Sequence, residues 1–373
     1  MRYVNLPFLP ASVLVLLISN AARVSAITNA QWFVDDICNT KYPGFSTDVV
    51  PEAIQMAADL VGKLNSNDDY NEIVFQQMFH GNDGQKGAIT QKFQNIAAMT
   101  QAAQPQDVHL IITCDNDAGF GTPIVRPKNT QNPKDVYNHQ DFHMRVTRSV
   151  GAKWGCTGAN TPIAHTMSIA QDTTPTNRQP WMDEGWQTTR SLVSICDRVG
   201  GKRIFERFGT LDKLISLLDT FQETNPNPQT QKVGTAFLNN AGTLPLLSRT
   251  VLHEFFHTRV VIDGTDAQII QSDVMHDQAA VGAKGKAYGW IQAGKLPDNL
   301  KIKNNDNYAF QGQMPALFDK GWRLQQNPPE AFQNGLIEAI VSIPNRVKRY
   351  INQKCRDILE RRKRGSECLA AIQ

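Results

Sequence analysis

The residues best suited to chemistry lie between Leu252 and Thr258, a stretch that reads L-H-E-F-F-H-T and contains H-E-x-x-H. A helix has about 3.6 residues per turn, so His253 and His257 would stand one above the other on one face. Both imidazoles could then reach one zinc ion at about 2.0–2.1 Å. Glu254, rotated by about 100° from His253, is suited to act as general base on a zinc-bound water. The pattern therefore predicts a catalytic zinc site.

The helix that carries this motif is predicted to start near Pro245 and to end by Gly264. Its motif turn is filled by four apolar side chains: Val251, Leu252, Phe255 and Phe256. This composition predicts a largely buried helix. Polar groups on a buried helix need partners, and zinc with its water would provide them.

A catalytic zinc keeps three protein ligands, so a third one must come from elsewhere in the chain. The segment after His257 has no His or Glu as far as Thr265. The downstream candidates are Asp263, Asp266, Asp273, His276 and Asp277. We favour Asp273, which follows the apolar pair Ile269-Ile270, and keep Asp266 as the alternative. Asp266 follows Gly264-Thr265 and could instead cap a turn.

Hydrophobic spacing predicts a chain of helices around a few strands. Helices are expected at 47–64, 71–80, 88–103 and 205–221, and from 314 to the end with a break at Asn327-Pro328-Pro329. Strands are expected at 108–114, 164–170 and 191–196, and a long loop at 115–140. This order of elements predicts an α+β fold.

The first 26 residues have the features of a secretory signal peptide. Arg2 precedes the apolar run 11–18, and Val24-Ser25-Ala26 provides small residues for cleavage. The chain has six cysteines, and an even number in a secreted protein favours disulfides. They are Cys38, Cys114, Cys156, Cys196, Cys355 and Cys368. We expect up to three disulfides, with Cys355 paired to Cys368 in the helical tail.

The net charge of +3 is unevenly distributed. Residues 346–364 hold nine Lys and Arg against two acidic residues, a local charge of +7, so the remainder carries −4. A body with this charge lacks the basic face of nucleic-acid-binding proteins. After the leader, no stretch approaches the length of about 18 apolar residues that a membrane span needs. We therefore expect a protein or peptide partner, no nucleic acid, no membrane, and a monomer.

Several short segments in and after the motif occur in an order that resembles the aspzincin metalloproteases, which include the secreted fungal deuterolysins and peptidyl-Lys endopeptidases. These segments are His253-Glu-Phe-Phe-His257, Gly264-Thr265-Asp266, Ile270-Gln-Ser-Asp273, Lys286-Ala-Tyr288-Gly289 and Asn304-Asn-Asp306-Asn307-Tyr308. The similarity covers roughly residues 190–312. It implies a zincin-like fold, mainly helical, with a small sheet beside the active helix. It also implies zinc held by the two histidines and an aspartate.

The resemblance also assigns roles to residues near the motif. Tyr288 or Tyr308 would help to stabilise the oxyanion, and Asp306 would hydrogen-bond a ligand histidine. Two departures stand out. Gln268 occupies a position where the compact family pattern has Asp, and the Tyr288-Gly289 pair comes much later than in that pattern. These two features form the first departure, and the second is Asn305, which replaces the family's usual Ala.

The sequence thus predicts a secreted, extracellular zinc endopeptidase, of a fungal type by resemblance. The predicted organisation is a signal peptide at 1–26, an N-terminal helical region at 27–105, a catalytic region at 106–320 and a basic helical tail at 321–373. Region 27–105 is either a propeptide or an integral part. Two other interpretations stay open: a secreted binding protein on the same fold with little proteolysis, and a structural protein with a chance motif.

Overall fold

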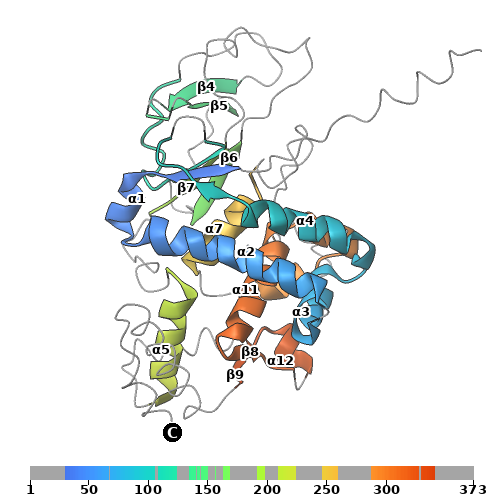
Figure 1. Cartoon of the computed structure of the whole chain (residues 1–373). Helices are drawn as coiled ribbons and strands as arrows, with labels where there is room; N and C mark the ends of the chain where they lie inside the picture. The colour runs from blue at the N-terminus through green and yellow to red at the C-terminus, as the bar shows by residue number, and fades with distance from the viewer. Residues whose placement is uncertain are drawn as a thin grey trace, which may run out of the picture.

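The computed structural model describes residues 30–66, 68–105, 108–123, 134–139, 141–142, 144–149, 156, 163–168, 191–197, 209–223, 246–258, 287–326 and 329–340. Within them the fold is mixed α+β, as predicted from the sequence. A five-stranded sheet has helices on one side and a β-hairpin on the other (Figure 1).

The sheet has the order β2-β1-β3-β7-β6. Its strands are β1 (Gln31–Val34), β2 (Thr100–Gln101), β3 (Leu110–Thr113), β6 (Ala164–Ser168) and β7 (Ser191–Ile195). The strand pairs β1–β2, β1–β3 and β3–β7 are parallel, whereas β6 runs antiparallel to β7. Among the described residues β6 is therefore an edge strand.

Alternating side chains give the sheet two buried faces. Leu110 and Ile112 join the large core on the helical side, whereas Ile111 joins a smaller cluster on the other side. The large core is built by α2 (Val50–Asn65), α3 (Asp69–Phe79), α4 (Lys86–Ala97), α7 (Leu247–Phe255) and α11 (Asn305–Asp319). The smaller cluster includes Phe142, which lies in the turn between β4 (Lys134–His139) and β5 (Met144–Ser149).

The remaining elements are short and lie around this core. Before α2 come α1 (Asp36–Lys41) and a π-helical turn, η1 (Phe45–Val49), and a 3₁₀ turn, η2 (Asp83–Gln85), precedes α4. The later elements are α5 (Leu211–Glu223), α9 (Trp290–Gly294), α10 (Asp298–Lys301), β8 (Trp322–Leu324), α12 (Pro329–Gln333) and β9 (Ile337–Ala339).

The predicted helices at 47–64, 71–80 and 88–103 correspond to α2, α3 and α4, and all three predicted strands are present. The helix predicted at 205–221 is found as α5, shifted towards the C-terminus. Two predictions were wrong. The predicted loop at 115–140 contains β4, and the predicted helix after residue 314 is interrupted by the β8–β9 hairpin. Gly321 and Gly335 adopt positive φ angles of 88° and 72° next to these two strands, which ends the helices.

Within the described residues two disulfides hold the fold together, Cys38–Cys114 and Cys156–Cys196. Disulfides persist mainly in oxidising compartments. Among the described helices, none is long and apolar enough to cross a membrane. The predicted signal peptide at 1–26 and the predicted Cys355–Cys368 pair lie outside the described residues.

Candidate metal centre

The H-E-x-x-H motif lies at the C-terminal end of α7, deep in the fold. His253 and Glu254 are only 7% and 5% exposed, and their apolar neighbours on the helix are fully buried. Helix α11 approaches α7 closely at Gly312, where an added Cβ would come within 2.7 Å of Leu252 Cδ2. The buried helix that the sequence predicted is confirmed, and its polar residues depend on protein partners for their hydrogen bonds.

The α-helix ends at Phe255, before the predicted limit of Gly264. The next three residues continue as a tighter turn, in which the amide N–H of His257 donates to the carbonyl of Glu254 at 3.0 Å. The α-helix therefore does not include His257. The tight turn nevertheless keeps His257 beside His253, with the ring centroids 5.2 Å apart.

This spacing suits a shared zinc ion. Two imidazoles that bind one tetrahedral zinc at about 2.0–2.1 Å have ring centres roughly 5 Å apart. The observed 5.2 Å between His253 and His257 matches that separation. The Nδ1 atom of His253 is engaged by Asp306 (below), which leaves Nε2 as the nitrogen for a metal. The residues present therefore fit a zinc ion.

Asp306, near the start of α11, fixes the ring of His253. Its Oδ1 lies 2.7 Å from His253 Nδ1, and its Oδ2 accepts a 2.6 Å hydrogen bond from the backbone N–H of Gly289. Burial alone would raise the pKa of this carboxyl group. The charge and hydrogen bond of His253, with Arg249 and the Gly289 N–H, outweigh burial and lower the pKa below its ordinary value. Asp306 is thus held as a carboxylate, the group that commonly orients a metal-binding histidine.

Arg249 lies one helical turn before His253, behind Asp306. Its Nη1 is 3.7 Å from Asp306 Oδ1, and its guanidinium carbon lies 4.6 Å from the ring centroid of Phe310. In the described part of the chain, Nε and Nη1 have no hydrogen-bond partner. Arg249 therefore acts on the site mainly through the charge it presents to Asp306. No sequence motif indicated this residue.

An asparagine pair at the start of α11 holds the segment that supplies Gly289. The Asn304 side-chain amide donates to the carbonyl of Ala287 at 3.0 Å and to Asn307 Oδ1 at 2.7 Å. Asn307 in turn donates to the carbonyls of Met78 and Ala293. These bonds fix α11 relative to α3 and to residues 287–293. Segment 304–307, one of the segments that resemble the aspzincins, therefore anchors the start of α11 to its neighbours.

Glu254 is positioned by the edge strand of the sheet. The hydroxyl of Thr166, on β6, donates to Glu254 Oε2 at 2.7 Å and lies 3.2 Å from the Glu254 carbonyl oxygen. Within the described residues Oε1 makes no hydrogen bond, so this oxygen can serve a water molecule. Sequence reasoning did not find Thr166, because the two residues are 88 positions apart.

The two candidate tyrosines lie in different surroundings. Tyr288 is 47% exposed, and its ring centroid is 5.8 Å from that of His253. Tyr308 is 1% exposed and stacks on Phe256. Its hydroxyl donates to the carbonyl of Ile302 at 2.8 Å and accepts from Lys92 Nζ at 3.0 Å. Tyr288 is therefore the tyrosine placed beside the motif, and Tyr308 is part of the core beneath it.

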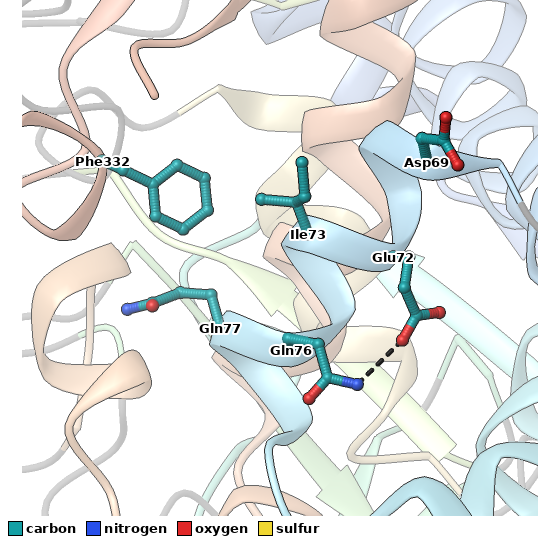
Figure 2. Close-up of a pocket in the computed structure, with 6 residues that line it drawn as sticks. All are labelled: Asp69, Glu72, Ile73, Gln76, Gln77 and Phe332. Atoms are coloured by element: carbon teal, nitrogen blue, oxygen red, sulfur yellow. Dashed lines mark hydrogen bonds between the residues drawn. The ribbon is translucent and has the colours of Figure 1, made fainter. Parts of the chain in front are cut away.

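The candidates for the third ligand, Asp266 and Asp273 with Asp263, His276 and Asp277, lie outside the described residues. A groove elsewhere in the described part of the molecule does not belong to this site. It is an open groove between α3 and α12, where Ile73 faces Phe332 and a carboxylate, Glu72, binds Gln76 at the rim (Figure 2). The groove contains no residue of the H-E-x-x-H motif.

Comparison with known proteins gave no match: no family model, no curated protein and no solved structure corresponds to this chain.

Proposed function

We propose that this protein is a secreted zinc-dependent endopeptidase of the aspzincin type. The observation that carries the proposal is the pair of adjacent imidazoles with centroids 5.2 Å apart, one of them held by a buried carboxylate. Glu254 lies next in the chain to His253 and is independently held by Thr166. A chance H-E-x-x-H sequence would have no reason to acquire both of these supports.

In the proposed site His253 and His257 would hold the ion, and Asp273, or alternatively Asp266, would provide the third ligand. When bound, zinc lowers the pKa of a water molecule towards neutrality. Glu254 would take the proton of the water whose oxygen attacks the carbonyl carbon, and would then give this proton to the leaving amine. Thr166 keeps one carboxylate oxygen in place during both transfers. The hydroxyl of Tyr288 donates to the carbonyl oxygen as it gains negative charge.

The edge strand β6 supplies a binding surface for an extended peptide. Within the described residues it pairs only with β7, so one of its edges has no strand beside it. A peptide can add to such an edge through backbone hydrogen bonds. Thr166 of β6 contacts Glu254 directly, so a peptide added along β6 would lie next to the general base. This placement supports proteins or peptides as substrates.

Metal content and proteolysis test the proposal together. Zinc analysis should find one bound ion in the wild type, and none in His253→Ala or His257→Ala. Glu254→Gln should keep the zinc and lose about 10²–10⁴-fold or more in casein hydrolysis, because Gln keeps the shape but cannot take the proton. Full zinc occupancy in a histidine variant would refute the site.

Each alternative interpretation predicts a different result in the same experiments. A secreted binding protein on this fold would bind zinc without cleaving casein, and a chance motif would bind no zinc. For the third ligand, Asp273→Ala should lower zinc affinity by orders of magnitude. Asp266→Ala should leave zinc bound and cost about 1 kcal/mol of stability if Asp266 caps a turn. The reverse pattern would assign the ligand to Asp266.

A further inference from the structure

A second group of potential metal ligands lies on the opposite face of β6. Successive side chains of a strand point to opposite faces, so His165 faces away from the side on which Thr166 meets Glu254. His165 pairs across the sheet with Ser194 of β7, and Cys196 follows at the end of that strand. The ligand atoms of Cys156, His165 and Cys196 all lie within 4.8 Å of one another.

Asp117 holds the imidazole of this group in place. Its Oδ1 and Oδ2 lie 3.0 and 3.1 Å from His165 Nε2, and Oδ2 also accepts from the backbone N–H of Cys156 at 3.0 Å. Asp117 itself is 3% exposed, in the loop that follows β3. A carboxylate at this distance fixes the ring orientation and the tautomer, as it does in many histidine ligands of zinc.

The donor set is suited to zinc. Two thiolates and one imidazole are ligands that zinc prefers, and tetrahedral sites with sulfur and nitrogen ligands are typical of it. Cys156 and Cys196 are 6% and 0% exposed, so the ion would be largely enclosed by protein. The fourth position would be left to water. In the structure the two sulfurs form a disulfide, and a disulfide sulfur is not a thiolate, so the metal and the disulfide exclude each other.

We propose that Cys156, His165 and Cys196 form a second zinc site in the reduced chain, and that a disulfide-containing oxidant releases the metal. The oxidant takes two electrons from the two thiolates and two protons from water and becomes a dithiol, while Cys156 and Cys196 form their disulfide. A newly made chain holds both thiols already. In a chain that is already oxidised, a dithiol reductant supplies two electrons and becomes a disulfide itself, while Cys156 and Cys196 become thiols. Zinc binding then releases the two thiol protons to water. The site shares no residue with the H-E-x-x-H motif and does not depend on the proposed function.

Cobalt provides a direct test, because thiolate ligation gives it a charge-transfer absorption in the near ultraviolet. The test uses the full chain with His253→Ala and His257→Ala, which removes the first site, kept reduced with a phosphine that contains no thiol. We expect one tetrahedral Co²⁺ per chain, displaced by Zn²⁺, and none after oxidation. The additional change His165→Ala, which keeps both thiols, should weaken cobalt binding at least about tenfold. Cys38→Ser with Cys114→Ser is the matched control and should leave it unchanged.

Alkylation gives a second measurement that does not depend on the spectrum. In the reduced chain, Zn²⁺ should slow modification of Cys156 and Cys196 by iodoacetamide at least about tenfold, with little effect on Cys38 and Cys114. Mass spectrometry of the peptides measures each rate. The proposal is overturned if the reduced chain shows no thiolate–cobalt absorption. It is equally overturned if the absorption persists in Cys156→Ser with Cys196→Ser, or if zinc protects Cys38 and Cys114 as strongly as Cys156 and Cys196.

Discussion

Replacing Asp306 by Asn tests how far the candidate metal centre depends on its buried carboxylate. The change removes the negative charge that faces both His253 and Arg249, yet keeps a similar shape. The side chains of Asp306 and Arg249 are 6% and 10% exposed, so Arg249 would become a buried cation without its counter-charge. Breaking a buried charge pair typically costs about 3–5 kcal/mol. The Asn carbonyl can still accept a hydrogen bond from the Gly289 N–H, so we expect the free energy of unfolding to fall by about 3 kcal/mol, at the low end of that range.

The same substitution should weaken zinc binding. Asp306 orients the His253 ring through a 2.7 Å contact with Nδ1, and loss of such a partner typically lowers metal affinity by about 10–100-fold. Urea unfolding of the metal-free protein measures the first effect, and competition with a zinc chelator measures the second. Asp319→Asn is a matched control at the other end of α11. Asp319 forms an ion pair with Lys63 but is 49% exposed, so its loss should cost at most about 1 kcal/mol and leave zinc affinity unchanged.

A double-mutant cycle tests whether the stability lost in Asp306→Asn comes from the interaction between Asp306 and Arg249. If Arg249 depends on Asp306, Arg249→Met with Asp306→Asn should be less destabilised than the sum of the single variants by about 1 kcal/mol or more. The reasoning is refuted if Asp306→Asn behaves like Asp319→Asn both in urea and in the zinc competition. Additive losses in the cycle would show instead that Arg249 and Asp306 act independently.

Three further predictions concern the surroundings of the site. Tyr288→Phe should lower kcat for casein by about tenfold or more. Tyr308→Phe should leave kcat unchanged and lower the free energy of unfolding in urea by about 1 kcal/mol. The opposite pattern would make Tyr308 the oxyanion donor. Burial lowers the pKa of Lys92 to about 8, so its charge destabilises the fold below that pH and the penalty disappears as the pH rises from 8 towards 10.5. Lys92→Met should therefore raise the unfolding free energy at pH 7 by about 1–3 kcal/mol. A variant less stable than the wild type at pH 7 would contradict this prediction. Burial alone would raise the pKa of Asp117, but His165, the Cys156 N–H and Ser194 outweigh burial and lower the pKa overall. The stabilising contribution of the Asp117 carboxylate should therefore be complete above about pH 4 and be lost as the pH falls through the folded-state pKa. Asp117→Asn should reduce this loss of unfolding free energy, measured by urea unfolding between about pH 2 and 5.

The parts of the site that lie within one helical turn could be predicted from the sequence. The spacing of His253 and His257 predicted adjacent rings, and the apolar residues around them predicted burial, because both properties depend on local periodicity. The pattern limited the end of α7 to Gly264 but did not place it at Phe255. The apolar pattern continues past Phe255, but the chain tightens there into i→i−3 hydrogen bonds. Periodicity alone does not distinguish the two kinds of turn.

The residues that support the motif could not be predicted by periodicity, because they come from distant parts of the chain. Thr166 reaches Glu254 across 88 positions, and Asp306 reaches His253 across 53. Asp306 was anticipated only through a resemblance, and Thr166 was not anticipated at all. The second cysteine–histidine group was missed for the same reason. Cys196 lies 31 positions after His165, and only the pairing of β6 with β7 brings these two residues together.

The structure also bears on whether residues 27–105 are a propeptide or an integral part. Strand β1 pairs with β2 on one side and with β3 on the other, inside the sheet. Removing it would leave β3 as an exposed edge, a common route to aggregation. Phe93 of α4 packs on Phe256, directly beneath the motif, and the Cys38–Cys114 disulfide would hold a cleaved segment in place. These contacts argue that the N-terminal region forms the floor of the candidate metal centre, so the candidate site needs it in order to fold.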